Sequence, residues 1–149
     1  MKSSISGEEK ILVVEDEPGI TQVCQRTLIA EGYQVDTAAN GAIAQNMLLQ
    51  EDYDLVIIDL RMPGLNGVET LRKLWEMGQT ARIYITTGFY NEFRDQLQCA
   101  ADEAISFFLI KKPVDIDEIR SIARVVSERP IRFRKSTSQV KSRVFNELL

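Results

Sequence analysis

The sequence predicts an α/β fold in which helices cover both faces of a parallel β-sheet, and three observations lead to this prediction. Five short apolar segments alternate along the chain with five segments of helical periodicity. Two of the apolar segments are unbroken aliphatic runs, as expected of strands buried on both faces. The chain has 149 residues, of which 44% are hydrophobic and 27% charged, values typical of one globular domain with a short appendage.

The five expected strands differ in their patterns. Ile11–Val14 and Leu55–Ile58 are the two continuous aliphatic runs, so they are expected at the centre of the sheet. Tyr33–Ala38 alternates between apolar and polar residues, which is typical of an outer strand. Ile83–Ile85 and Ile105–Ile110 complete the set.

The helices are predicted from apolar residues that recur at intervals of three and four. Gly32 and Gly78 are expected to end the first and third helices, because glycine readily adopts the left-handed conformation of a C-cap. Asp115 and Glu118 have the spacing of a capping box at the start of the fifth helix. The predicted helical segments are Ile20–Leu28, Ala42–Leu49, Val68–Trp75, Glu92–Ala101 and Ile116–Val126.

Ligands of such sheets bind beyond the carboxyl ends of the strands, so the residues found there are the candidates for function. Glu15 and Asp16 follow the first strand, Asp59 the third, Thr87 the fourth and Lys112 the fifth. Crowded carboxylates repel one another unless a cation shares their site, and oxygen ligands suit Mg²⁺. A lysine and a hydroxyl beside that ion would suit a phosphoryl group, and an aspartate can itself be the nucleophile that accepts it.

Four segments at these strand ends resemble the receiver domain of bacterial two-component response regulators. They are Ile11–Pro18, Asp59–Gly67, Thr87–Gly88 and Lys112–Pro113, and they follow the order and nearly the spacing of the family. The resemblance covers roughly residues 10–128 and implies a flavodoxin-like, doubly wound sheet of five parallel strands in the order 2-1-3-4-5, with five helices. It leaves open whether the protein stands alone or is part of a longer regulator.

The resemblance also implies a role for each residue of the site. Asp59 would be the phosphoacceptor and a Mg²⁺ ligand, Asp16 would bind the ion directly, and Glu15 would act mainly through a bound water. The backbone carbonyl of Arg61 would supply a further ligand.

The resemblance also implies roles for the residues at two more strand ends. Lys112 would bridge the acceptor carboxylate or the phosphoryl oxygens, through a peptide bond to Pro113 that is expected to be cis. Thr87 would hydrogen-bond the phosphoryl group, and Gly88 would keep its neighbourhood open. The protein would then be a phosphoacceptor switch that assists its own phosphorylation and dephosphorylation, rather than an enzyme.

The chain contains no histidine, so it cannot supply its own phosphohistidine. We therefore expect the phosphoryl group to come from a separate histidine kinase or histidine phosphotransfer protein. Phosphorylation would change partner affinity at the surface formed by the fourth and fifth helices and the last strand. The expected output partner is an unknown separate protein or a missing C-terminal output domain.

Three features depart from the family pattern. The family commonly has an aromatic residue three places before its lysine, where this chain has Leu109, with Phe108 one position away. Either a bulge brings Phe108 into register or the aromatic part of the switch is altered. In the family, the positions of Arg61 and Phe89 flank the path of the hydrolytic water, so the bulk of these two side chains predicts slow autodephosphorylation. The chain is also slightly long before its last strand, and the extra residues are expected around 98–104.

The two ends of the chain are expected to differ from the domain between them. Residues 1–9 are predicted to be disordered, and residues 10–128 to form the domain. Through Glu128 there are 12 Lys and Arg against 21 Asp and Glu, whereas residues 129–149 hold 6 against 1. This basic tail is a disordered end, a docking or homodimerising helix, or a linker to an output domain. A nucleic-acid arm is the least favoured alternative, because six basic residues without a recognition fold bind only non-specifically.

Other functions compete with the receiver prediction. A Mg²⁺-dependent phosphohydrolase with an aspartyl nucleophile should carry that nucleophile after the first strand, with a second acid two residues later. Asp16 is followed instead by Glu17 and Pro18. A flavodoxin-like mononucleotide binder should have a glycine- and hydroxyl-rich loop there. A receiver-like protein-binding module that is never phosphorylated is the remaining alternative. In isolation, each acid could also be an ordinary solvated loop residue.

The location of the protein is predicted from what its composition lacks. No apolar run approaches the roughly 20 residues that span a bilayer, and the first ten residues are polar, unlike a signal peptide. Cys24 and Cys99 have no metal-ligand spacing and are expected to be reduced. We therefore expect a cytoplasmic protein that has no membrane contact.

Overall fold

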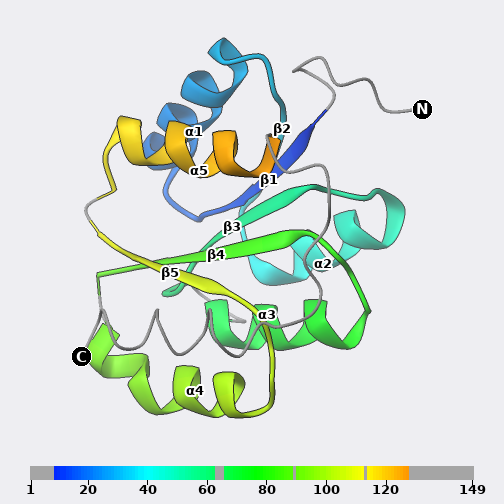
Figure 1. The fold of residues 1–149 in the computed structure, drawn as a ribbon, viewed down its shortest axis with the longest axis vertical. Helices are drawn as coiled ribbons and strands as arrows, with labels where there is room; N and C mark the ends of the chain where they lie inside the picture. The colour runs from blue at the N-terminus through cyan, green and yellow to red at the C-terminus, as the bar shows by residue number, and fades with distance from the viewer. Residues whose placement is uncertain (1–8, 63–65, 89, 113, 128–149) are drawn as a thin grey trace.

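The sheet has five parallel strands in the order β2-β1-β3-β4-β5, as predicted (Figure 1). The computed structural model describes residues 9–62, 66–88, 90–112 and 114–127. The strands are β1 (Lys10–Val14), β2 (Gln34–Ala38), β3 (Leu55–Asp59), β4 (Arg82–Thr87) and β5 (Phe108–Lys111).

Helices cover both faces of this sheet. They are α1 (Pro18–Ala30), α2 (Gly41–Gln50), α3 (Gly67–Glu76), α4 (Tyr90–Asp102) and α5 (Ile116–Ser127). Figure 1 shows α1 and α5 together on one face and α2, α3 and α4 on the other. Each strand is followed by a helix that returns across the sheet, so all strands point the same way and their carboxyl ends meet at one edge.

The aliphatic runs of β1 and β3 are central because both of their faces are buried. Leu12 and Val56 point into the core on the side of α2, α3 and α4, whereas Val13 and Ile57 point into the core beneath α1 and α5. Alternate residues of one strand therefore belong to two separate cores. Burial of both sets of side chains favours the sheet by roughly 2 kcal/mol for each large aliphatic residue.

Three helices end with the same pair of backbone hydrogen bonds. Gly32, Gly78 and Ala104 have positive φ angles of 100°, 76° and 68°, and each N–H donates to a carbonyl of the last helical turn. The N–H of the following residue donates to the carbonyl one residue further back. The predicted endings at Gly32 and Gly78 are thus confirmed, but Ala104 takes this role without being a glycine.

These helix ends explain why two strands begin later than predicted. The N–H of Tyr33 is bonded to Leu28 O at 3.2 Å, and the N–H of Ile105 to Ala100 O at 3.1 Å. Both residues therefore belong to helix caps rather than to strands. The predicted strand Ile105–Ile110 is wrong over its first three residues, since β5 begins at Phe108. Residues 98–104, where extra length was expected, form the last turn of α4 and its cap.

The start of α5 was predicted correctly. Asp115 Oδ1 accepts a hydrogen bond from the N–H of Glu118 at 2.8 Å, and Glu118 Oε1 accepts one from the N–H of Asp115 at 3.2 Å. Asn66 and Glu69 form the same reciprocal pair at the start of α3. That second capping box has a recognisable sequence spacing, which the prediction did not use.

The aromatic position near β5 is altered, and the bulge alternative is wrong. The β4–β5 register runs without a break from Tyr84 opposite Phe108 to Thr87 opposite Lys111. The Phe108 ring stacks on Tyr84, which packs against the core beneath α1 and α5. Leu109 packs against the other core, so an aliphatic side chain holds the place where an aromatic ring was expected.

Several predictions fall on residues outside the described ranges. These are the disordered segment 1–9, apart from Glu9, the basic tail 129–149, Phe89, and the peptide bond between Lys112 and Pro113. Within the described ranges, none of the helices is both long and apolar enough to cross a membrane.

Candidate functional site

Four neighbouring strands bring the predicted site residues to one edge of the sheet. Glu15 follows β1, Asp59 ends β3, Thr87 ends β4 and Lys112 follows β5. Backbone hydrogen bonds continue the strand pairing at this edge: the N–H of Lys112 donates to Thr87 O at 2.7 Å, and the N–H of Leu60 donates to Thr86 O at 2.9 Å. The rigid backbone of the sheet therefore sets the relative positions of these groups.

Three carboxylates and one ammonium group meet at the centre of this edge. Oxygen atoms of Glu15, Asp16 and Asp59 all lie within 4.8 Å of one another. Glu15 and Asp59 are only 5% and 6% exposed, whereas Asp16 is exposed to solvent. Lys112 Nζ lies 3.0 Å from Asp59 Oδ1 and 3.8 Å from Glu15 Oε1. One positive charge therefore faces three carboxylates.

This imbalance changes the acidity of two groups. Burial, followed by the negative charge of Asp59, raises the pKa of Glu15 to about 7. Burial would lower the pKa of Lys112, but its hydrogen bond to Asp59 and the surrounding negative charges outweigh that effect, so the pKa is raised. The ammonium is thus held in its charged form, whereas burial and the charge of Asp59 favour the protonated form of Glu15.

The donor set fits a hard divalent cation. Carboxylate oxygens are the ligands that Mg²⁺ prefers, and three of them within 4.8 Å can contact one ion. Two of the three are buried, where an uncompensated negative charge is unfavourable. Burial and the charge of Asp59 raise the pKa of Glu15, and a cation beside the three carboxylates would offset both effects.

Close packing by Gly67 fixes the turn that follows Asp59. The N–H of Gly67 donates to Leu60 O at 2.8 Å. A Cβ atom added at Gly67 would lie 2.6 Å from Leu60 Cα and 2.8 Å from Asp59 O, closer than such atoms can approach. The first turn of α3 therefore contacts the backbone of Asp59 and Leu60 directly, which explains why the sequence has a glycine at position 67.

The remaining predicted residues lie around this centre. Thr87 is buried, at 1% exposure, beside the backbone of Lys112. Arg61 is exposed, and its Nη1 lies 4.0 Å from Glu92 Oε1 at the start of α4, a contact with no signal in the sequence. A Cβ at Gly88 would meet Lys112 Cβ at 3.7 Å, which is ordinary van der Waals contact. The ligand role of the Arg61 carbonyl stays a prediction.

Known proteins are similar to this chain in sequence. Residues 11–124 match the family model described as the response regulator receiver domain. Sporulation initiation phosphotransferase F of Bacillus subtilis is 38% identical over 117 residues, which cover 78% of this chain and 91% of that protein. Response regulator ArlR of Staphylococcus aureus is 34% identical over 80% of this chain, and the match spans 53% of ArlR.

Solved structures of receiver proteins are also similar to this chain. The response regulator TrrA from Thermotoga maritima, in complex with Mg²⁺ and beryllofluoride, is 33% identical with a TM-score of 0.66, over 79% of this chain and 98% of that one. Chemotaxis protein CheY4 of Vibrio cholerae is 26% identical with a TM-score of 0.68 over the same shares of the two chains. Fold, acidic edge and relatives lead to one assignment. The chain belongs to the receiver domain family of response regulators, the phosphoacceptor switches of two-component signalling.

Proposed function

We propose that Asp59 is the phosphoacceptor of this receiver domain and that Mg²⁺ is required for its phosphorylation. The observation that carries the proposal is the ion pair of 3.0 Å between Asp59 and Lys112, beside two further carboxylates. Glu15, Asp16, Asp59 and the backbone carbonyl of Arg61 would hold the ion, with Glu15 acting mainly through a bound water. When bound, Mg²⁺ would neutralise part of the charge on the phosphoryl oxygens.

Phosphoryl transfer to Asp59 follows from the charges around it. A carboxylate oxygen of Asp59 attacks phosphorus, the bond between phosphorus and a histidine nitrogen of the donor breaks, and the imidazole leaves with that electron pair. The ammonium of Lys112 then donates hydrogen bonds to the phosphoryl oxygens in place of the carboxylate. The hydroxyl of Thr87 supplies a further hydrogen bond from the neighbouring strand.

The donor is a histidine kinase or a histidine phosphotransfer protein, since the chain itself contains no histidine. A phosphorelay role is supported by the Bacillus subtilis relative, whose name calls it a phosphotransferase and which matches over 91% of its length. The output is a separate protein or a domain that lies elsewhere in a longer regulator. Phosphorylation adds negative charge at the edge of the sheet and changes partner affinity at the surface of α4, β5 and α5.

The central experiment treats the protein with acetyl phosphate and Mg²⁺ and follows its mass. We expect the wild type to gain one phosphoryl group and Asp59→Asn to gain none. Beryllofluoride with Mg²⁺ should likewise cause a spectroscopic change in the wild type but not in Asp59→Asn. A phosphoryl group that appears on Asp59→Asn, or its absence from the wild type, would overturn the proposal.

The same adduct tests the predicted slow autodephosphorylation. Arg61 follows Asp59 by two residues, and its Nη1 lies 4.0 Å from Glu92 Oε1. We infer from the bulk of this side chain that it restricts the approach of water to Asp59. We expect Arg61→Ala to shorten the half-life of the phosphorylated protein several-fold. A wild-type half-life of only seconds, or one that Arg61→Ala leaves unchanged, would contradict this.

A further inference from the structure

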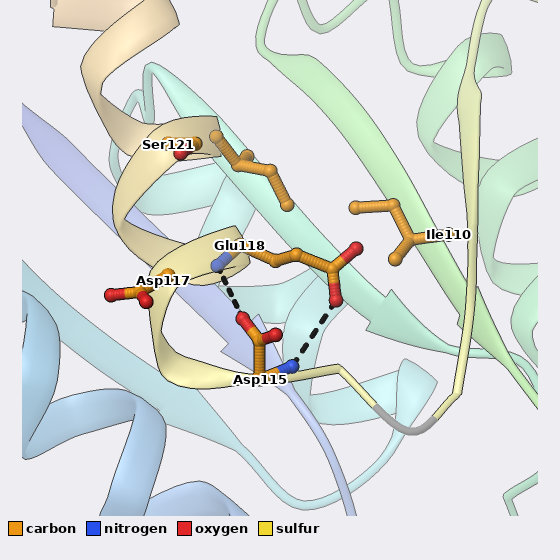
Figure 2. A pocket seen from close by; sticks show the side chains of 6 residues that line it. Ile110, Asp115, Asp117, Glu118 and Ser121 are labelled. Atoms are coloured by element: carbon orange, nitrogen blue, oxygen red, sulfur yellow. Dashed lines mark hydrogen bonds between the residues drawn. The ribbon is translucent and has the colours of Figure 1, made fainter.

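A shallow groove of about 350 Å³ lies between β5 and the first turns of α5, outside the acidic site (Figure 2). Its floor is apolar and its rim is acidic. The lining residues are Ile110, Asp115, Asp117, Glu118, Ser121 and Ile122. None of the described residues that line it is basic, so the groove is suited to an apolar side chain flanked by positive charges.

The acidic rim is already held in place by local structure. Asp115 and Glu118 are fixed by the capping box of α5, and Figure 2 shows the Glu118 side chain extending toward Ile110. Each of these hydrogen bonds uses one carboxylate oxygen and leaves further acceptor positions. Asp117 is 91% exposed and forms an ion pair of 3.1 Å with Arg120. An incoming basic group therefore meets acceptors that need no rearrangement.

An exposed apolar side chain continues the groove toward the end of α5. Residues 118, 121, 122 and 125 are spaced by three and four, so they lie along one side of the helix. Val125 is 40% exposed on this side, beyond Ser121 and the buried Ile122. The groove thus leads from the capping box to the point where the chain leaves α5.

We propose that residues 128–149 dock along this groove of their own chain. From Arg129 onward the sequence has six Lys and Arg against one Glu, with Val140, Val144, Phe145 and Leu148 at helical spacing. Basic residues would contact the carboxylates of the rim, and the apolar residues would cover Ile122 and Val125. The inference goes beyond the proposed phosphorylation and does not depend on it.

Chain length favours docking within one molecule. The 12 residues of α5 span about 18 Å at 1.5 Å per residue, and an extended chain covers about 3.3 Å per residue. Roughly six residues after Ser127 are therefore enough to return to Asp115, and the apolar residues 140–148 lie well within reach. A short tether also gives the segment a millimolar effective concentration at the groove, above that of a second copy in dilute solution.

The test uses the full chain with a nitroxide label on Ser138→Cys. Cys99→Ser removes the exposed thiol, while Cys24 is buried and stays in place. We expect the label to remove most of the amide signal intensity of Ser121, Ile122 and Val125 relative to a reduced label. The proposal is wrong if broadening is absent from the groove, centres on another face, or appears between labelled and unlabelled molecules in a mixed sample.

Two variants make the test specific. Ser121→Lys adds a positive charge to the groove and should restore the signals, whereas Gln50→Lys adds the same charge on α2 and should not. If Ser121→Lys does not fold, Val125→Lys serves the same purpose, since this side chain is also exposed. Raising the salt concentration should weaken the broadening, because charge pairs at the rim are screened. Broadening that a folded groove variant leaves unchanged would overturn the assignment.

Discussion

The two ends of the sheet differ in how their charged groups are paired. Near the amino ends of the strands three acids have matched partners, although Oε1 of the buried Glu9 has no hydrogen-bond partner. The hydroxyl of Tyr53 donates to Asp36 Oδ2 at 2.6 Å, Lys10 Nζ pairs with Glu51, and the N–H of Lys10 donates to Asp54 Oδ2 at 2.9 Å. Burial and the hydrogen bond to Asp36 together raise the pKa of Tyr53, so the phenol stays a donor.

At the carboxyl ends, Glu15, Asp16 and Asp59 crowd together, and Lys112 pairs with Glu15 and Asp59. The amino end pairs three of its acids within the protein, whereas the carboxyl end leaves negative charge that Lys112 does not balance. The difference shows where the fold gives up stability for function. Four substitutions would break or sharpen this comparison.

The largest effect is expected for Gly67→Ala, at the carboxyl end. The new methyl would lie 2.6 Å from Leu60 Cα, so α3 or the backbone after Asp59 must shift. We therefore expect a loss of about 3 kcal/mol in the free energy of unfolding. Gly19→Ala in α1 is the control, because nothing lies within 4 Å of the added Cβ. Urea unfolding measures both, and equal stability of the two variants would refute the role of close packing.

Next in size is the contrast between two lysines of similar exposure. The side chains of Lys112 and Lys10 are 27% and 28% exposed. Their partners differ, because the side chain of Asp59 is 7% exposed and that of Glu51 is 49% exposed. Lys112→Met leaves buried carboxylates without their ammonium and should cost about 2 kcal/mol. Lys10→Met should cost less than about 1 kcal/mol, because its partner stays hydrated. Thermal unfolding in EDTA measures the loss of stability in both variants. Equal losses would contradict this prediction.

Glu15→Gln should act in the opposite direction and depend on pH. In the fold the pKa of Glu15 rises from 4.5 to about 7, so the folded state holds this proton more tightly than the unfolded state. Without metal, stability should therefore fall as pH rises through the window from 4.5 to 7. Glu15→Gln removes the ionisation and should stabilise the metal-free protein at pH 8 by about 1 kcal/mol, after allowance for screening.

Melting temperatures in EDTA between pH 5 and pH 8 check this prediction. The wild type should lose stability across the range, and Glu15→Gln should lose less. Glu51→Gln, at the other end of the sheet, is the control and should follow the wild type. A wild-type slope that Glu15→Gln leaves unchanged would show that another group titrates.

The smallest effect is expected for Tyr53→Phe at the amino end. The substitution removes one hydrogen bond to Asp36, which remains able to contact water, so the loss should be at most about 1 kcal/mol. Addition of Mg²⁺ should stabilise this variant and the wild type equally, because the two ends are independent. A variant that loses its response to Mg²⁺ would show that the ends are coupled.

The sequence predicted most of the architecture because its strongest signals are local. The aliphatic runs of β1 and β3, the capping box of Asp115 and Glu118, and the order of the strand ends needed no knowledge of tertiary contacts. The acidic cluster was expected for the same reason, since parallel strands bring their carboxyl ends to one edge.

What the sequence did not predict depends on contacts between distant residues. The start of β5 was misplaced because Ile105 gives its N–H to Ala100, a choice that its apolar neighbours do not reveal. The contact between Arg61 and Glu92 joins the segment after β3 to the first turn of α4, and no sequence pattern links these two residues. The burial that raises the pKa of Glu15 likewise exists only once β1 and β3 lie side by side.

Ala104 has a consequence for how easily the helices rearrange. A left-handed backbone costs an alanine about 1 kcal/mol that Gly32 and Gly78 do not incur, so α4 ends less securely than α1 or α3. Among these three helices, α4 would therefore unwind its last turn first. Faster amide hydrogen exchange at Ile105 than at Tyr33 would be the sign of it, and equal rates would show that the packing of Ile105 compensates.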